Sequence, residues 1–398
     1  MAVGPWVSGN CRHVSGKGLG RRRLLLSAIL TLIVGPACFV RAAAEGDPAW
    51  PRVPAGVEYV HRRVGDVPWA IHVVKVDRSR AGFDFVSTLG QGRICGLATV
   101  RRQVGTVGGE LGRAIAAVNG DFFVIRSGPY QGDPTGLHIV AGELVSTSRG
   151  GAFWIDTEGG ARIGEVHTRI RVTGPGGIDV QAGLNQQRAD DAAVLFAPVF
   201  GDSTRTSGGR ELVLEAAGAE DWLPLRVGAT CRGRVAAIRE GGNAPLGPNT
   251  VVLSIGPEKA GALAGLSEGA VVEIAVSSSP DLAGVRTAVG GGAILIQDGK
   301  PRSWQGSLPR HPRTAVGYNA EHVFLVVVDG RREGLSVGMT YVELAALMGE
   351  LGCTDAINLD GGGSSTLWLG ESVMNQPSDG RERAVANSLV LVDKGEKE

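Results

Sequence analysis

The stretch AINLDGGGSST, residues 356–366, places a carboxylate directly after an apolar run and follows it with three glycines and three hydroxyl residues. Because side chains alternate along a strand, Asn358 and Asp360 would share one face. Glycines permit positive φ and carry no Cβ, so consecutive backbone N–H groups can converge on an anion. We expect Gly361–Gly363 and the Ser364 hydroxyl to approach a phosphate or a sugar. A glycine-rich turn without a ligand is the alternative.

Three further clusters put polar groups directly after apolar runs, where a sheet would fix their geometry. They are Asn119 with Asp121, His311 with Arg313, and Asp329 with Arg331. Arginine matches phosphate geometry best, so Arg313 and Arg331 are candidates for holding an anion. Ordinary surface salt bridges are the alternative for both arginines, and a structural role is the alternative for His311.

Several familiar sites are excluded or unsupported. No Lys lies near the glycines, which excludes a P-loop, and the run lacks the last glycine of a G-x-S-x-G elbow, which disfavours a serine hydrolase. No C-x-x-C occurs, which excludes a zinc ribbon. No cofactor is required, but Asn358, Asp360 and Asp329 offer oxygens of the kind that Ca²⁺ or Mg²⁺ binds, so a divalent metal is a variant of the site.

The elements that must position these groups are short strands and one clear helix. Residues 323–329 and 356–360 are apolar runs typical of strands buried on both faces, and each ends in a carboxylate. Between them, residues 339–352 carry an apolar stripe at helical spacing and a capping box at Thr340 and Glu343. Other expected elements are strands at 69–76, 83–86 and 114–118, hairpins at 153–164 and 293–302, and a weaker helix from Leu97.

Composition and charge set the class of protein. The chain has 398 residues, of which 43% are hydrophobic and 20% charged, as in globular proteins. Lys plus Arg equals Asp plus Glu at 40 each, so nothing favours a nucleic-acid partner. Cys95, Cys231 and Cys353 are widely spaced, which favours buried free thiols, with one disulfide after export as the alternative.

The N-terminus is typical of an export signal. Residues 1–23 are polar and end in three arginines, residues 24–40 are apolar, and an A-x-A site follows at Ala42–Ala44. The arginines also match a twin-arginine signal, and an uncleaved membrane anchor is the alternative. We therefore expect a signal over 1–44, a Pro-rich linker over 45–56, one domain over 57–393 with an insertion at 165–285, and a tail over 394–398. The protein would be periplasmic or extracellular and would meet the membrane only through its signal.

The motifs together resemble the phosphodiester glycosidase family. They are NGDFF, GLHIVAGEL, HPRTAVGYN, VVDGRREGLSVGMTYVEL, NLDGGGSST and NQPSDGRERAVANSLVL, and they occur here in that order. The resemblance implies an α+β fold with a β-rich twisted sheet and a few packed helices. It also implies an exported enzyme that acts on glycosyl 1-phosphodiesters. The site residues that it implies are Asn119, Asp121, Arg313, Asp329, Arg331, Ser336, Asp360, Gly361–Gly363, Ser364 and Arg383.

Cleavage of a sugar C1–O bond with phosphate as the leaving group needs a carboxylate near C1 and cations near the phosphate. Asp360 is the expected indispensable carboxylate, with Asp121 and Asp329 as further catalytic candidates. We expect hydrolysis of an N-acetylglucosamine-1-phosphodiester-like substrate in cell-envelope or exopolysaccharide metabolism. The alternative is a non-catalytic envelope protein that binds a glycan or sugar phosphate.

Overall fold

The computed structural model describes residues 51–395 apart from 148, 219–221, 264 and 305–308. The expected export signal, most of the linker and most of the tail lie outside these residues. Within them, no helix is long and apolar enough to cross a membrane. The structure is 45% strand and 11% helical, so it is mostly β, and the expected α+β class is supported only loosely.

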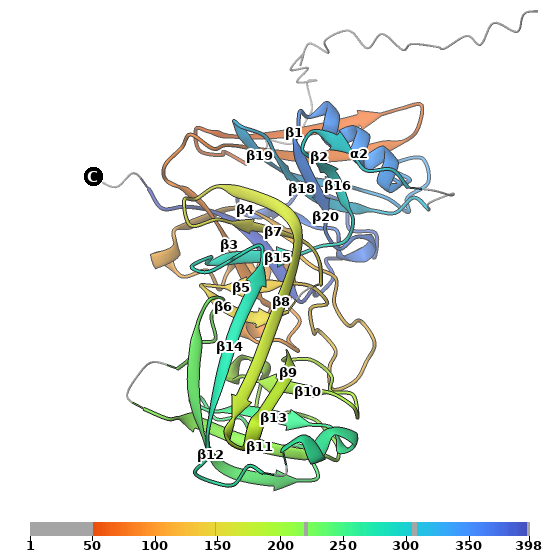
Figure 1. Ribbon diagram of the computed structural model, residues 1–398. Coiled ribbons are helices and arrows are strands. Elements are labelled where there is room, and N and C mark those ends of the chain that lie inside the picture. The colour runs from red at the N-terminus through yellow and green to blue at the C-terminus, as the bar shows by residue number, and fades with distance from the viewer. Residues whose placement is uncertain (1–50, 148, 219–221, 264, 305–308, 396–398) are drawn as a thin grey trace, which may run out of the picture. The chain divides into compact units, whose positions relative to one another are not determined.

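A seven-stranded sheet carries two of the carboxylates that follow apolar runs. Its strands, in spatial order, are β1 (Val57–Val64), β2 (Trp69–Asp77), β19 (His322–Val328), β18 (Arg313–Tyr318), β20 (Asp355–Asn358), β16 (Ile294–Gln297) and β17 (Lys300–Pro301). β18 pairs antiparallel with both β19 and β20. These two strands, labelled in the upper part of Figure 1, therefore run in the same direction. The residues that follow them, Asp329 and Asp360, lie at the same end of the sheet.

A five-stranded sheet packs on one face of the first sheet. It contains β22 (Ser372–Val373), β21 (Leu367–Leu369), β4 (Arg113–Asn119), β23 (Asn387–Asp393) and β3 (Phe83–Leu89). Buried side chains from both sheets form one cluster, in which Val118 and Leu389 join Val316 and Leu325. The Asp360 N–H donates to the Gly120 carbonyl at 2.9 Å. The end of β4 is thereby fastened to the end of β20.

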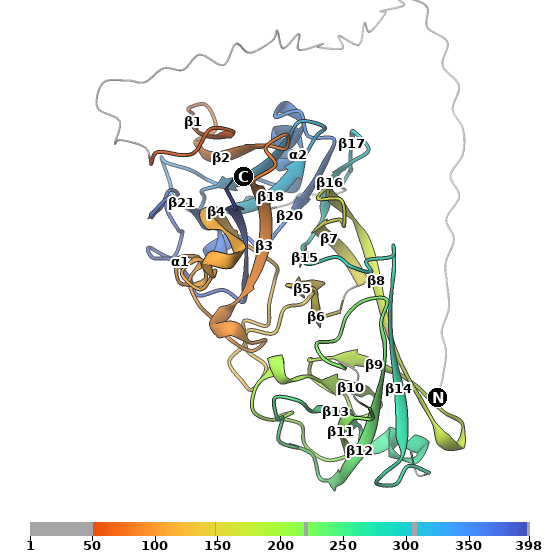
Figure 2. The same ribbon diagram turned by 90° about the vertical axis from the view of Figure 1, so that its left-hand side faces the viewer.

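An eleven-stranded sheet includes a closed ring. Its order is β14 (Val271–Ser279), β12 (Thr230–Glu240), β11 (Arg210–Ala216), β13 (Val251–Ile255), β10 (Ala193–Phe196), β9 (Ile178–Leu184), β8 (Ala161–Gly174), β7 (Arg149–Ile155), β15 (Thr287–Gly290), β5 (His138–Val140) and β6 (Glu143–Ser146). β14 also pairs with β8, which closes seven strands into a barrel (Figure 2). These seven strands cover the expected insertion. One half of the long β8 pairs with β7 and the other half with β9 and β14.

Helices cover the outer faces of two sheets. α2 (Tyr341–Glu350) has the expected capping box between Thr340 and Glu343, and its Leu344 and Met348 pack on the seven-stranded sheet. α1 (Val100–Val104) is much shorter than the helix expected from Leu97, as the glycines at 105, 108 and 109 end it early. Short 3₁₀ turns occur at Gly90–Gly92, Gly109–Leu111, Pro175–Gly177, Pro198–Phe200, Pro257–Leu263 and Gly362–Ser364. The three described cysteines are free thiols.

Candidate active site

Asp360 is held at the junction of two sheets by its own backbone. Its N–H donates to the Gly120 carbonyl, and its carbonyl accepts from Asn119 Nδ2 at 2.7 Å. The fully buried Asn119 also accepts, through Oδ1, from the Thr314 hydroxyl at 2.7 Å and from the Thr366 N–H at 3.1 Å. Asn119 is thus occupied in fastening three segments around Asp360. Its expected role in substrate binding stays a prediction.

The Asp360 carboxylate has partners that favour its charged form. Oδ1 accepts from the Gly361 N–H at 2.8 Å. Burial raises the pKa of Asp360, while hydrogen bonds from Ser364 and Gly361 and the charge of Arg383 oppose that rise. The side chain is only partly buried, so a ligand can reach it.

The glycines after Asp360 leave room for two guanidinium groups. Gly362 has φ +63°, and a Cβ there would lie 2.9 Å from Arg331 Nη2. A Cβ on Gly363 would lie 2.1 Å from Arg383 Nη2. Both arginine side chains therefore lie directly against the loop of residues 361–364, which a residue larger than glycine would prevent.

The expected anion nest of backbone N–H groups is not supported in this loop. The N–H groups of residues 361, 362, 364 and 365 already donate within the protein, to Asp360 Oδ1 and to the carbonyls of Pro312, Gly361 and Gly362. The donors that the loop can present to an anion are chiefly the two guanidinium groups. The glycines thus act by making room for cations.

Each of these arginines has a neighbour that orients it. Arg383 forms an ion pair with Asp379, with Nη2 and Oδ2 2.7 Å apart, and its Nη1 donates to the Ser364 hydroxyl at 3.4 Å. Arg331 is exposed, and its Nη2 lies 3.5 Å from His311 Nδ1. Partial burial and the charges of Arg313 and Arg331 lower the pKa of His311, which favours the neutral ring at pH 7.

Asp121 is the second carboxylate of the site. It is 2% exposed, and its two oxygens accept from the N–H groups of Phe122 at 2.7 Å and Gly136 at 2.5 Å. Burial raises the pKa of Asp121 to about 7, and the nearby Asp360 charge adds to the rise. Asp133, which is 7% exposed, lies behind it, and burial with the charge of Asp121 raises its pKa to about 8. Both carboxylates are thus shifted upward by burial, but the charge of Arg383 opposes the rise at Asp360, whereas the charge of Asp360 adds to the rise at Asp121.

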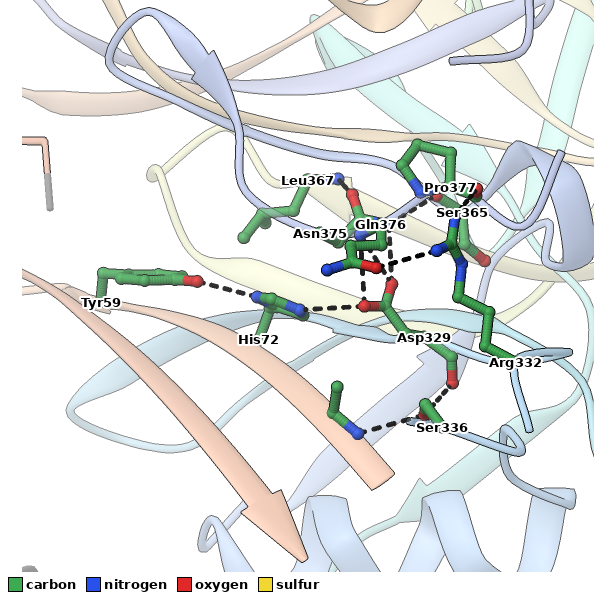
Figure 3. A network of polar contacts seen from close by, with 11 residues as sticks. Tyr59, His72, Asp329, Arg332, Ser336, Ser365, Leu367, Asn375, Gln376 and Pro377 are labelled. Carbon is green, nitrogen blue, oxygen red and sulfur yellow. Dashed lines mark hydrogen bonds and ion pairs between the residues drawn. The ribbon is translucent and has the colours of Figure 1, made fainter. Parts of the chain in front are cut away.

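Asp329 lies in a buried network behind the loop (Figure 3). Its carboxylate lies 3.4 Å from His72 Nε2 and accepts from Asn375 Nδ2 at 3.1 Å and from the Gln376 N–H at 3.0 Å. His72 Nδ1 is 2.8 Å from the Tyr59 hydroxyl. In the tautomer with its hydrogen on Nε2, His72 donates to the Asp329 carboxylate and its Nδ1 accepts from the Tyr59 hydroxyl.

The same network reaches the loop. Asn375 Nδ2 also donates to the Ser365 carbonyl at 3.0 Å, and Asn375 Oδ1 accepts from the Leu367 N–H at 2.8 Å. Arg332 Nη1 donates to Gln376 Oε1 at 2.9 Å (Figure 3). Asp329 therefore anchors the segment that continues to Asp379 and Arg383. A catalytic role for Asp329 itself stays a prediction.

Two other expected site residues, Ser336 and Arg313, are engaged within the protein. Ser336 Oγ donates to the Asp329 carbonyl at 2.5 Å and accepts from the Ala70 N–H at 3.1 Å. Arg313 is 6% exposed; its Nε donates to the Met339 carbonyl at 2.7 Å, and its guanidinium carbon lies 4.3 Å from the Tyr341 ring centre. Their roles toward a substrate stay predictions.

A metal site is weakly supported by the donor set. Asn358 is fully buried, its Nδ2 donates to the Leu359 carbonyl, and its Oδ1 has no hydrogen-bond partner in the described protein. Among the described residues, no group of three or more His, Cys, Asp or Glu side chains could hold a metal ion. Ca²⁺ takes about six to eight oxygen ligands, so we assign no metal here, and metal dependence stays a prediction.

Several residues of this region were not identified from the sequence. Asp133 follows a loop glycine, and only its burial and the effect of the Asp121 charge on its pKa reveal it. Asp379 could have been suspected, because it lies four residues before Arg383 at a spacing that allows an ion pair. His72 lies within an apolar strand, where a lone histidine carries little signal.

Comparison with known proteins bears on the C-terminal part of the chain. Residues 226–392 match the family model described as phosphodiester glycosidase. A stretch of 113 residues is 34% identical to the SPbeta prophage-derived uncharacterized protein YomE of Bacillus subtilis strain 168. That stretch is 27% of this chain but only 18% of the Bacillus protein.

Two solved structures share the fold over most of the chain, and a third is similar at a lower score. A hypothetical protein from Synechocystis superposes with a TM-score of 0.67 at 18% identity, over 84% of this chain and 61% of that one. A Burkholderia pseudomallei protein, provisionally named as exported, superposes with a TM-score of 0.65 at 25% identity, over 82% of this chain and 74% of that one. A third structure is the catalytic domain of zebrafish N-acetylglucosamine-1-phosphodiester alpha-N-acetylglucosaminidase, auto-inhibited by its pro-peptide. Its TM-score is 0.44 at 16% identity, over 88% of this chain and 87% of that one.

The family model covers Asp360, the glycine loop and both arginines, whereas Asp121 lies outside it. The resemblance inferred from the motifs is confirmed to this extent: residues 226–392 of the chain match the phosphodiester glycosidase family model.

Proposed function

We propose that the protein is an exported hydrolase that cleaves the bond between a sugar C1 and the phosphate of a glycosyl 1-phosphodiester. The observation that carries this proposal is a pair of neighbouring carboxylates in different environments, beside a glycine loop on which two arginines lie. The family of residues 226–392 supports the same reaction class.

Asp360 faces the sugar carbon in this proposal. The transition state carries positive charge at C1 and the ring oxygen, and a carboxylate stabilises that charge. Burial raises the pKa of Asp360, and the hydrogen bonds from Ser364 and Gly361 and the charge of Arg383 favour the charged form that this role needs. Asp121, with a pKa raised to about 7, exchanges a proton with the reacting groups near neutral pH.

Arg331 and Arg383 hold the phosphate. The C1–O bond breaks with its electron pair going to the phosphate oxygen, which leaves as part of a monoester. Water supplies the new oxygen on C1, and its surplus proton passes through a carboxylate to solvent. The leaving phosphate is already anionic, so cations aid its departure more than a strong general acid does.

The proposal is tested on the purified full chain with N-acetylglucosamine 1-(methyl phosphate) as substrate and free sugar as the measured product. We expect Asp360→Asn to reduce turnover by about 10²- to 10⁴-fold with an unchanged circular dichroism spectrum. Asp66→Asn, on an exposed turn, is the matched control and should retain activity. If a panel of sugar 1-phosphodiesters binds but releases no sugar, the protein is a binding protein and the enzyme proposal fails.

Export is proposed from the N-terminal sequence and from the provisional naming of the Burkholderia relative. Cell fractionation with N-terminal sequencing tests it. Processing after about residue 44, with the protein outside the cytoplasm, is expected. An unprocessed cytoplasmic protein would refute it.

A further inference from the structure

A polar cleft lies over the barrel, apart from the carboxylates. It has a volume of about 690 Å³, within the range of about 300–1,000 Å³ that ligand sites occupy. Its hydroxyl and amide side chains are Thr135, Thr147, Thr168, Gln181 and Gln186. β8 and β9, which lie side by side in the sheet (Figure 1), provide part of its wall.

The lining matches a neutral, hydroxyl-rich ligand. Hydroxyl and primary amide groups both donate and accept hydrogen bonds, as sugar hydroxyls require. The charged groups are one of each sign, Asp191 and Lys259, so the cleft has no net charge to select an anion. Small residues, including Ala182 and Ala192, leave part of the wall open to a ring.

Two features of β9 build the cleft. Val180, Ala182 and Leu184 are buried in the barrel, so the alternation of the strand turns the exposed Gln181 outward. A Cβ on Gly183 would lie 2.8 Å from Gln186 Cδ. Glycine at this position thus allows the Gln186 amide to lie over the strand.

The cleft begins at the segment that holds Asp121. The Thr135 N–H and hydroxyl both donate to the Phe122 carbonyl, at 3.0 and 3.3 Å. The next residue, Gly136, donates its N–H to Asp121 Oδ2. Thr135, at one end of the cleft lining, is thus tied to the two residues Asp121 and Phe122 by its own hydrogen bonds and by those of the next residue.

We propose that this cleft binds a neutral glycan chain joined to the sugar at Asp360. The inference rests on the proposed function and deepens it: the substrate is an oligosaccharide or polysaccharide phosphodiester, and residues 165–285 supply its additional subsites. The phosphate remains on the side of Arg331 and Arg383.

The test compares substrates of different chain length. The full chain is assayed with two substrates: the 1-(methyl phosphate) of N-acetylglucosamine and the 1-(methyl phosphate) of the β1,4-linked tetrasaccharide of N-acetylglucosamine. The corresponding pairs made from glucose and from mannose are assayed in the same way. We expect at least one tetrasaccharide substrate to have a lower KM than its monosaccharide. The double variant Gln181→Ala/Gln186→Ala should raise that KM about tenfold, as the loss of two neutral hydrogen bonds predicts, and leave the monosaccharide KM unchanged.

Gln187→Ala is the matched control, because Gln187 is exposed beside Gln186 but does not line the cleft. Calorimetric binding of the four uncharged tetrasaccharides (chito-, cello-, malto- and manno-) separates this inference from the reaction. Binding that the double variant abolishes supports the cleft even if no phosphodiester is hydrolysed. If no tetrasaccharide binds and chain length does not affect KM, the inference is overturned even if hydrolysis occurs.

Discussion

Replacing Asp329 distinguishes an anchoring carboxylate from a catalytic one. Asp329→Ala removes the acceptor for two buried donors, on His72 and Asn375, and for the partly buried N–H of Gln376. Each donor left without a partner costs about 1–3 kcal/mol. Some relaxation is expected, so we predict a loss of about 3–5 kcal/mol in the free energy of unfolding. Since domains are stable by about 5–15 kcal/mol, the variant should still fold in the cold.

Asp329→Ala should also reduce activity, because Asp329 anchors the segment that holds Arg383. Asn375 links Asp329 to the Ser365 carbonyl, and its segment continues to Arg383. A displacement of about 1 Å at Arg383 would reduce activity roughly 100-fold, chiefly as a higher KM for the phosphodiester. Asn375→Ala should reproduce this change, because it breaks the same connection while leaving the carboxylate in place.

The assays are urea unfolding and steady-state kinetics at a temperature where all variants are folded. Asp66→Ala, on an exposed turn, should change neither quantity. Two results together would refute the reasoning. The first is that Asp329→Ala abolishes turnover while its free energy of unfolding stays within about 0.5 kcal/mol of that of the unaltered chain, which is the scatter of surface substitutions. The second is that Asn375→Ala remains active. That outcome would make Asp329 a participant in the chemistry.

Two further predictions concern Asp121 and the loop. Burial raises the pKa of Asp121 to about 7, against about 3.9 in an unfolded chain, so the native state holds the extra proton between these values. Stability should therefore fall as the pH rises from about 4 to 7, and Asp121→Asn should flatten this slope in urea titrations; an unaltered slope would count against the assignment. Gly363→Ala should raise KM about tenfold by displacing Arg383, while Gly65→Ala, whose Cβ would meet nothing within 4 Å, should be neutral in the same kinetic assay.

Local patterns in the sequence were sufficient for the elements that carry most of the site. The apolar runs before Asp329 and Asp360 became β19 and β20, and the capping box at Thr340 begins α2. These features depend on residues within one turn or strand. That β19 and β20 end at the same end of the sheet depends on the pairing of β18 with both of them. No local pattern in the sequence specifies this pairing.

Contacts between distant segments account for what the sequence did not reveal. The barrel closes because β8 pairs with β14, whose Ser279 lies opposite His167, more than a hundred residues earlier. Asp133 acquires its significance from burial and from the charge of Asp121, which together raise its pKa. Contacts with another segment also bear on the predicted nest of N–H groups, because the Pro312 carbonyl accepts from the Gly362 N–H.

The glycine run also explains how two carboxylates of one type can take different roles. Burial raises the pKa of both, but only Asp360 has a nearby cation, because Gly363 leaves space for Arg383 beside it. Asp121 accepts from two backbone N–H groups, while burial and the charge of Asp360 raise its pKa to about 7. The cation beside Asp360 thus separates the electrostatic environments of the two carboxylates, and their proposed roles rest on that separation. A bulkier residue at 363 would reduce that separation as well as weaken phosphate binding, so the pH profile of Gly363→Ala should shift along with its KM.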